Sequence, residues 1–135
     1  MVSFDGIDYE YKKLHRFVEI ARSLMHKPQS SFLHFSFITK GTHIYSIGWN
    51  DVTKTSKLVK YPLGGVHAEA MSIGGLENLN LCRKATLINI RLNPRKELRL
   101  SKPCDVCLGF VKKMGFKKIF YSTEVGFEFM DLRSF

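Results

Sequence analysis

The sequence has few cysteines, few acidic residues and no long apolar run. Three cysteines among 135 residues exclude a framework of several disulfide bonds. Lys, Gly, Pro or Asn interrupt the apolar runs well short of the roughly 20 residues that a membrane-spanning helix needs. Residues 1–6 also lack the basic start and apolar stretch of a signal peptide. We therefore expect a cytoplasmic protein that makes no contact with a membrane.

The chain also lacks linkers, low-complexity tracts and internal repeats. Hydrophobic residues make up 44% of the sequence and aromatic residues 13%, which is enough to fill one hydrophobic core at this length. We therefore expect residues 1–135 to form a single domain.

The shortage of acidic residues gives the chain a formal net charge of +9. Residues 83–118 hold 11 Lys or Arg and only two acidic residues, so the whole excess lies in this segment. A basic region of this kind can attract the phosphates of a nucleotide, a nucleic acid or another polyanionic partner. A hydrated surface that only keeps the protein soluble is the alternative explanation.

Hydrophobic spacing predicts a helix and a hairpin in the first half of the chain. Apolar residues recur every three or four positions over 8–26, which is typical of an amphipathic helix. The β-rich runs 32–38 and 43–49 are separated by a Lys-Gly pair and predict two antiparallel strands. Alternation places Leu33, Phe35 and Phe37 on one face of the first strand.

Helices and strands alternate in the second half of the chain. The predicted elements are a long loop at 50–65, a helix at 67–75, a strand at 85–92, a basic loop at 93–102, a helix at 103–115 and strands at 118–122 and 127–132. The last two strands must be antiparallel, because a parallel return takes about a dozen residues or more. We expect an α/β fold, a three-layer α/β/α sandwich around a five-stranded mixed sheet with an antiparallel C-terminal hairpin.

Two short motifs lie at the starts of two predicted helices, at residues 67–69 (His-Ala-Glu) and 103–107 (Pro-Cys-Asp-Val-Cys). Zinc binds imidazole and thiolate ligands tetrahedrally, and catalytic sites use three protein ligands and leave one position for water. His67, Cys104 and Cys107 supply three such ligands. The positive ends of helices stabilise thiolates. A Cys-x-x-Cys pair alone also occurs in redox motifs and structural zinc sites.

Glu69 follows the histidine ligand by two residues. A carboxylate there can take a proton from a water that zinc activates and deliver it to a nucleobase. This is the chemistry of hydrolytic deamination. A non-catalytic, zinc-stabilised binding module is the alternative, but such a module would have no need of Glu69.

The pair of motifs H-x-E and P-C-x-x-C is the signature of zinc-dependent nucleobase deaminases. On these residues the chain resembles the cytidine and deoxycytidylate deaminase superfamily, over nearly its whole length. The resemblance implies a cytidine-deaminase-like sandwich, bound Zn²⁺ and a homo-oligomer, a dimer or tetramer. The C-terminal hairpin is similar to the free-nucleoside branch, whereas His67 and residues 48–50 are similar to the deoxycytidylate and polynucleotide branch.

Several residues are candidate substrate contacts. In the family an asparagine placed like Asn50 binds the substrate sugar, and the resemblance implies this role here. Trp49 either stacks on the base or packs in the core, and Lys54 either receives a phosphate or stays hydrated. The other candidate substrate-binding residues are Ala68, Ser101 and Lys102. We expect Cys82 to be a buried small apolar residue, and surface or core roles are expected for the remaining histidines, His15, His26, His34 and His43.

We expect the substrate to be a cytosine-type base within a free nucleoside or nucleotide such as deoxycytidylate, giving the uracil product and ammonia. The alternative substrate is single-stranded DNA or RNA. In that case the basic segment would follow the backbone, and binding would weaken steeply with salt. A short chain offers little surface for such a track.

Overall fold

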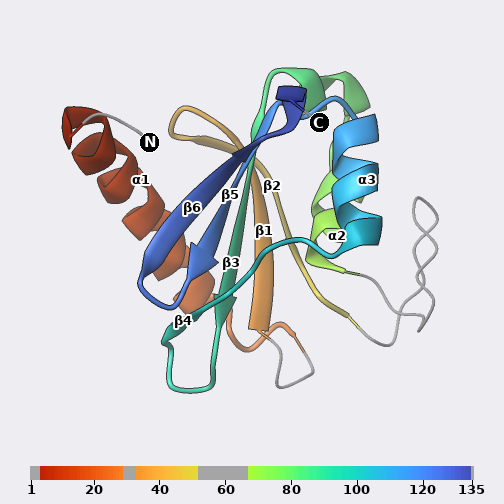
Figure 1. Cartoon of the computed structure of the whole chain (residues 1–135). Coiled ribbons are helices and arrows are strands. Elements are labelled where there is room, and N and C mark those ends of the chain that lie inside the picture. Colours follow the sequence, from red (N-terminus) through yellow and green to blue (C-terminus); the bar gives the residue numbers. More distant parts are fainter. Residues whose placement is uncertain (1–3, 29–32, 52–66, 135) are drawn as a thin grey trace.

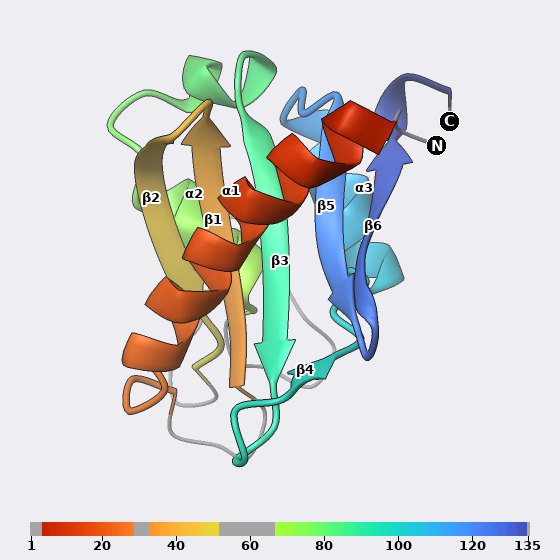
Figure 2. The same ribbon diagram turned by 90° about the vertical axis from the view of Figure 1, so that its left-hand side faces the viewer.

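The structure is a computed structural model that describes residues 4–28, 33–51 and 67–134, with side chains from residue 12 to residue 133. Its elements form three layers (Figure 1): helix α1 lies on one face of a single sheet, and helices α2 and α3 lie on the other. Figure 2 shows α1 crossing the strands diagonally. The predicted α/β/α sandwich is confirmed.

The three helices span Phe4–Ser23 (α1), Ala68–Gly74 (α2) and Asp105–Lys113 (α3). Helix α1 begins earlier than predicted, at Phe4. It also ends earlier, because the chain leaves the helix for a turn after Ser23. Its apolar stripe is buried as expected, with Phe17 and Ala21 fully inaccessible to solvent. Within the described ranges, no helix is long and apolar enough to cross a membrane.

The sheet has the strand order β2-β1-β3-β5-β6, with β4 paired to β3. The strands are β1 (Leu33–Lys40), β2 (His43–Trp49), β3 (Thr86–Leu92), β4 (Leu98–Arg99), β5 (Lys118–Thr123) and β6 (Gly126–Asp131). Strands β3 and β5 are parallel and the other pairs are antiparallel, so the mixed sheet and its C-terminal hairpin are as predicted. Two short 3₁₀ helices, η1 (Leu79–Arg83) and η2 (Leu132–Ser134), were not predicted.

Strand β4 makes the sheet six-stranded, whereas the sequence predicted five strands and a basic loop at 93–102. A tight turn in this segment returns the chain to β3, where Leu98 pairs with Leu92. The Asn93 side chain holds the turn by accepting hydrogen bonds from the backbone N–H groups of Arg95 (3.0 Å) and Glu97 (2.9 Å). Two residues are too few to show a strand periodicity, which is why the sequence did not predict β4.

The two faces of the sheet have different cores. Leu33, Phe35 and Phe37 pack together against α1, which confirms that they share a face. On the α2/α3 face, apolar residues such as Ile38 and Leu87 fill only part of the layer. Farther along the same strands the buried residues are polar, and this polar region lies next to the starts of α2 and α3.

Candidate active site

The starts of helices α2 and α3 bring the three predicted ligands together. His67 is the N-cap of α2, Cys104 is the N-cap of α3, and Cys107 lies in the first turn of α3. His67 Nδ1 is 3.7 Å from Cys104 Sγ and 3.4 Å from Cys107 Sγ. The candidate ligand atoms all lie within 4.8 Å of one another. The structure therefore joins two motifs that are far apart in the sequence.

This donor set suits zinc in both chemistry and spacing. Tetrahedral zinc with Zn–N of about 2.0–2.1 Å and Zn–S of about 2.3 Å places neighbouring donors roughly 3.5–3.8 Å apart. The two measured separations are close to that range. The Cys107 N–H donates to Cys104 Sγ at 3.4 Å, and such hydrogen bonds at a helix start favour the thiolate that a metal requires. His67, Cys104 and Cys107 could thus hold a zinc ion.

Glu69 lies in the first turn of α2, and only 1% of it is exposed. Its Oε2 accepts a hydrogen bond from Asn89 Nδ2 at 3.1 Å. Its Oε1 is also buried and has no hydrogen-bond partner among the described residues. Because an unsatisfied buried carboxylate oxygen is costly, this atom indicates a position where a ligand or reacting group would bind.

Asn89 is the residue that orients Glu69. Its Oδ1 accepts a hydrogen bond from Ser36 Oγ at 2.6 Å, and its Nδ2 donates to Glu69 and to the carbonyl oxygen of Ser101. Asn89 and Ser36 are fully buried and face each other on β3 and β1. Sequence reasoning missed both residues. The available signal was a single asparagine inside the apolar strand 86–92.

His34 lies on the same face of the sheet, two residues before Ser36 on β1, where it is opposite Arg91. Burial lowers the pKa of His34 below its usual value, and the nearby Glu69 carboxylate opposes this shift, while His67 and Arg91 add to it. Burial therefore favours the neutral form of the ring. Its Nε2 is buried and has no hydrogen-bond partner among the described residues. His34 thus faces the candidate site, a position that its sequence context did not indicate.

Asn50 and Trp49, at the end of β2, differ in where their side chains lie. The Asn50 Oδ1 accepts a hydrogen bond from the His34 N–H at 3.1 Å, so Asn50 is fixed beside a residue of the site. The Trp49 ring packs against the α1-side core, with Lys27 Nζ 5.8 Å from its centroid. That is the opposite face from Glu69, so the structure favours core packing over base stacking for Trp49. The substrate role of Asn50 stays a prediction.

The other candidate substrate contacts differ in exposure. Ala68 is fully buried at the start of α2. Ser101 is also buried, and its hydroxyl donates to the Asn89 carbonyl (2.9 Å) and accepts from the Ser122 N–H (2.7 Å). Lys102 is exposed, two residues before Cys104. Lys54 lies outside the described residues. Substrate binding by these four residues stays a prediction.

The position of α2 depends on a close approach of β2. A Cβ atom added at Gly48 would lie 2.3 Å from the backbone N of Ser72 and 2.4 Å from the carbonyl oxygen of Ala68. Only glycine therefore lets the strand run this near the helix. The contact fixes the helix that holds His67 and Glu69.

The layers and the strand order give the chain the fold of solved dCMP deaminase structures, and the three-ligand group fits a zinc site. The structure is similar to the dCMP deaminase from the cyanophage S-TIM5. In its apo form that protein is 16% identical, with a TM-score of 0.53 over 79% of each chain. In its complex with dCMP and dUMP it is 15% identical, with a TM-score of 0.50 over 90% of this chain and 83% of that one. No protein-family model and no curated protein sequence matches the chain.

Proposed function

We propose that this protein is a zinc-dependent hydrolase that deaminates a cytosine-type base in a free nucleoside or nucleotide, giving the uracil product and ammonia. The observation that carries the proposal is the buried Glu69 carboxylate, with one oxygen unpartnered, two residues after a ligand of the His67, Cys104, Cys107 group. The similar cyanophage enzyme, solved with dCMP and dUMP, supports a nucleotide as the substrate.

The proposed reaction gives separate roles to the metal, Glu69 and Asn89. Zinc, when bound, supplies Lewis-acid activation of a water molecule. The Glu69 carboxylate would accept a proton from the attacking water and deliver protons to the base as the C–N bond breaks. Asn89 holds Oε2, which leaves Oε1 to exchange protons. Overall, water and the aminated base give the oxo product and ammonia.

Two other functions have some support. The basic excess in residues 83–118 suits a deaminase acting on single-stranded DNA or RNA. The three-ligand group alone would suit a non-catalytic zinc-stabilised module. The module is the weaker candidate, because burying Glu69 costs stability and brings such a module no benefit.

A substrate panel tests the proposal. The purified protein would be incubated with nucleosides, nucleotides and single-stranded oligonucleotides, and the products identified by mass spectrometry. We expect cytidine or deoxycytidylate to be converted to the uracil product with release of ammonia. Conversion of oligonucleotides alone, with a steep salt dependence, would favour the polynucleotide alternative. No conversion of any member by the zinc-loaded protein would favour the binding module.

We further propose that the protein is cytoplasmic, since thiolate ligands persist in a reducing compartment. All three cysteines are free in the structure, in agreement with this proposal. A single domain over residues 1–135 and a homo-oligomer also stay proposals. Size-exclusion chromatography with light scattering would measure the oligomeric state.

A further inference from the structure

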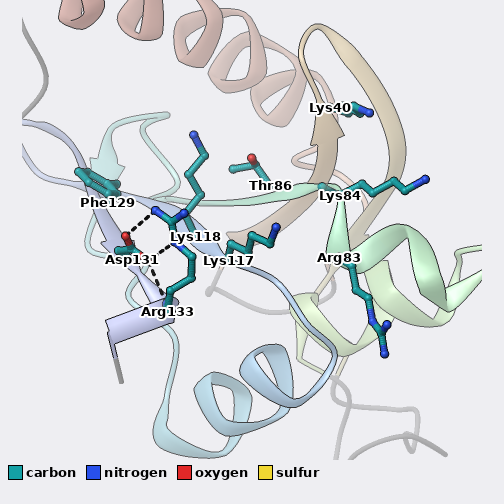
Figure 3. Close-up of a pocket in the computed structure, with 10 residues that line it drawn as sticks. Lys40, Arg83, Lys84, Thr86, Lys117, Lys118, Phe129, Asp131 and Arg133 are labelled. Carbon is teal, nitrogen blue, oxygen red and sulfur yellow. Dashed lines mark hydrogen bonds and ion pairs between the residues drawn. The ribbon is translucent and has the colours of Figure 1, made fainter.

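A hollow of about 430 Å³ (Figure 3) lies at the opposite end of the sheet from the three candidate zinc ligands. Strand β1 shows the separation, because His34 near its start faces the candidate site and Lys40 at its other end lines the hollow. Six of the ten described lining residues are basic, and they are Lys40, Arg83, Lys84, Lys117, Lys118 and Arg133. We call this site the basic hollow.

The positive charge of the basic hollow is largely uncompensated. Its one acidic lining residue, Asp131, is paired with Arg133 through a bidentate contact, and hydrogen bonds from Arg133 lower the pKa of Asp131 to about 2. The other five basic side chains make no ion pair with any described residue. Lys118 lies opposite Asp131 in the β5–β6 pair and interacts with its carboxylate electrostatically, and its Nζ is 5.5 Å from the centroid of the Phe120 ring. Five like charges around one concavity repel one another, and a bound anion would relieve this repulsion.

The shape of the basic hollow favours a compact anion over an extended strand. The basic residues come from segments that are distant in the sequence: the ends of β1, β5 and η1, and η2. Figure 3 shows that these side chains come from several elements and do not follow a single line. Its volume lies in the range of about 300–1,000 Å³ typical of small-molecule sites. Lys and Arg are the side chains that bind phosphate oxygens most often.

We propose that the basic hollow binds a compact polyphosphate group, either free or carried on a small molecule. The site is separate from the candidate active site and does not depend on the proposed deamination. Phe129, 44% exposed on the lining, adds an apolar surface beside the charges.

Calorimetric titration with inorganic tripolyphosphate tests this proposal. The double substitution K84E/K117E would be compared with R95E/K113E, which changes the net charge equally at exposed residues that do not line the hollow. Each exposed ion pair is worth up to about fivefold in affinity. We therefore expect K84E/K117E to weaken binding about tenfold or more. The control should bind within about twofold of the wild type, because its two side chains do not line the hollow and solvent screens their charges.

Amide shift mapping on the wild-type protein locates the site even if the variant does not fold. We expect tripolyphosphate to shift the resonances of residues 83–86 and 117–118 and to leave those of residues 67–69 unchanged. Equal loss of tripolyphosphate affinity in the two double variants would overturn the proposal, because the loss would then depend only on the net charge of the protein. Amide shifts centred on the candidate zinc ligands would also overturn the proposal. Tighter binding of an oligothymidylate of eight nucleotides than of tripolyphosphate would overturn it as well.

Discussion

At the scale of single residues, the candidate site depends on how Glu69 is held. A buried carboxylate with one hydrogen-bond donor retains much of its desolvation cost. This cost is consistent with a role for the Glu69 carboxylate in the reaction and not in stabilising the fold. Asn89 therefore acts as a positioning residue, because it fixes one carboxylate oxygen through a hydrogen bond of 3.1 Å.

Replacing Asn89 should impair turnover while the metal site remains. In Asn89→Leu, Glu69 loses its donor, and we expect kcat to fall about 10- to 100-fold, as for other residues that orient catalytic groups. In Asn89→Asp, two facing carboxylates would share a proton, so the acid limb of the rate profile should move to higher pH. Steady-state kinetics across pH, with zinc content measured in parallel, would check both results. An unchanged pH profile in Asn89→Asp would contradict the positioning role.

Lys102 provides a test of substrate class at the same scale. It is exposed close to Cys104, where it could pair with a substrate phosphate. Lys102→Ala should raise KM for deoxycytidylate several-fold, as expected for an exposed ion pair, and leave KM for cytidine unchanged. Lys113→Ala, at another exposed position, is the matched control. Equal changes for the two substrates would remove Lys102 from phosphate binding.

The sequence predicted some site residues and not others for a physical reason. His67, Glu69, Cys104 and Cys107 belong to short local motifs, so their chemistry could be inferred from spacing alone. Asn89, Ser36 and His34 enter the site only through the pairing of β1 with β3. That register is a long-range property, which local periodicity does not show.

At the scale of elements, the contact between β2 and α2 positions His67, one of the three candidate metal ligands, together with Glu69. Gly48→Ala would drive a Cβ into the backbone of α2, and overpacking of this kind costs about 1–3 kcal/mol. We expect a lower melting temperature and weaker zinc binding. Gly109→Ala is the control, since its Cβ meets nothing within 4 Å and Gly to Ala in a helix adds about 0.5–1 kcal/mol. A Gly48→Ala protein as stable as wild type would refute the close approach.

The predicted elements were accurate where hydrophobic periodicity was strong or where a short connection left only one possible pairing of strands. The C-terminal hairpin and the α1 stripe were predicted because few residues join β5 to β6 and apolar residues recur at helical spacing. The turn at Asn93 was missed, because side-chain hydrogen bonds and not hydrophobic pattern create it. Residues 52–66, most of the predicted long loop, lie outside the described residues.

At the scale of the whole molecule, a zinc ion held by His67, Cys104 and Cys107 would link helices α2 and α3, which otherwise share only a small contact. Zinc that binds only the folded state adds about 2.7 kcal/mol at a hundredfold excess over its Kd. Removing zinc with a chelator should therefore lower the melting temperature, and restoring zinc should reverse the change. The Cys104→Ser, Cys107→Ser double variant should show no response to the chelator. A response equal to that of the wild type would place the metal elsewhere.

The most direct test of the central claim compares the wild-type protein with Glu69→Gln, with both zinc content and deamination measured on the same samples. We predict about one zinc per chain in both proteins, deamination of cytidine or deoxycytidylate by the wild type, and a rate about 10²- to 10⁴-fold lower in the variant. A Glu69→Gln protein that holds zinc and deaminates at nearly the wild-type rate would contradict the account.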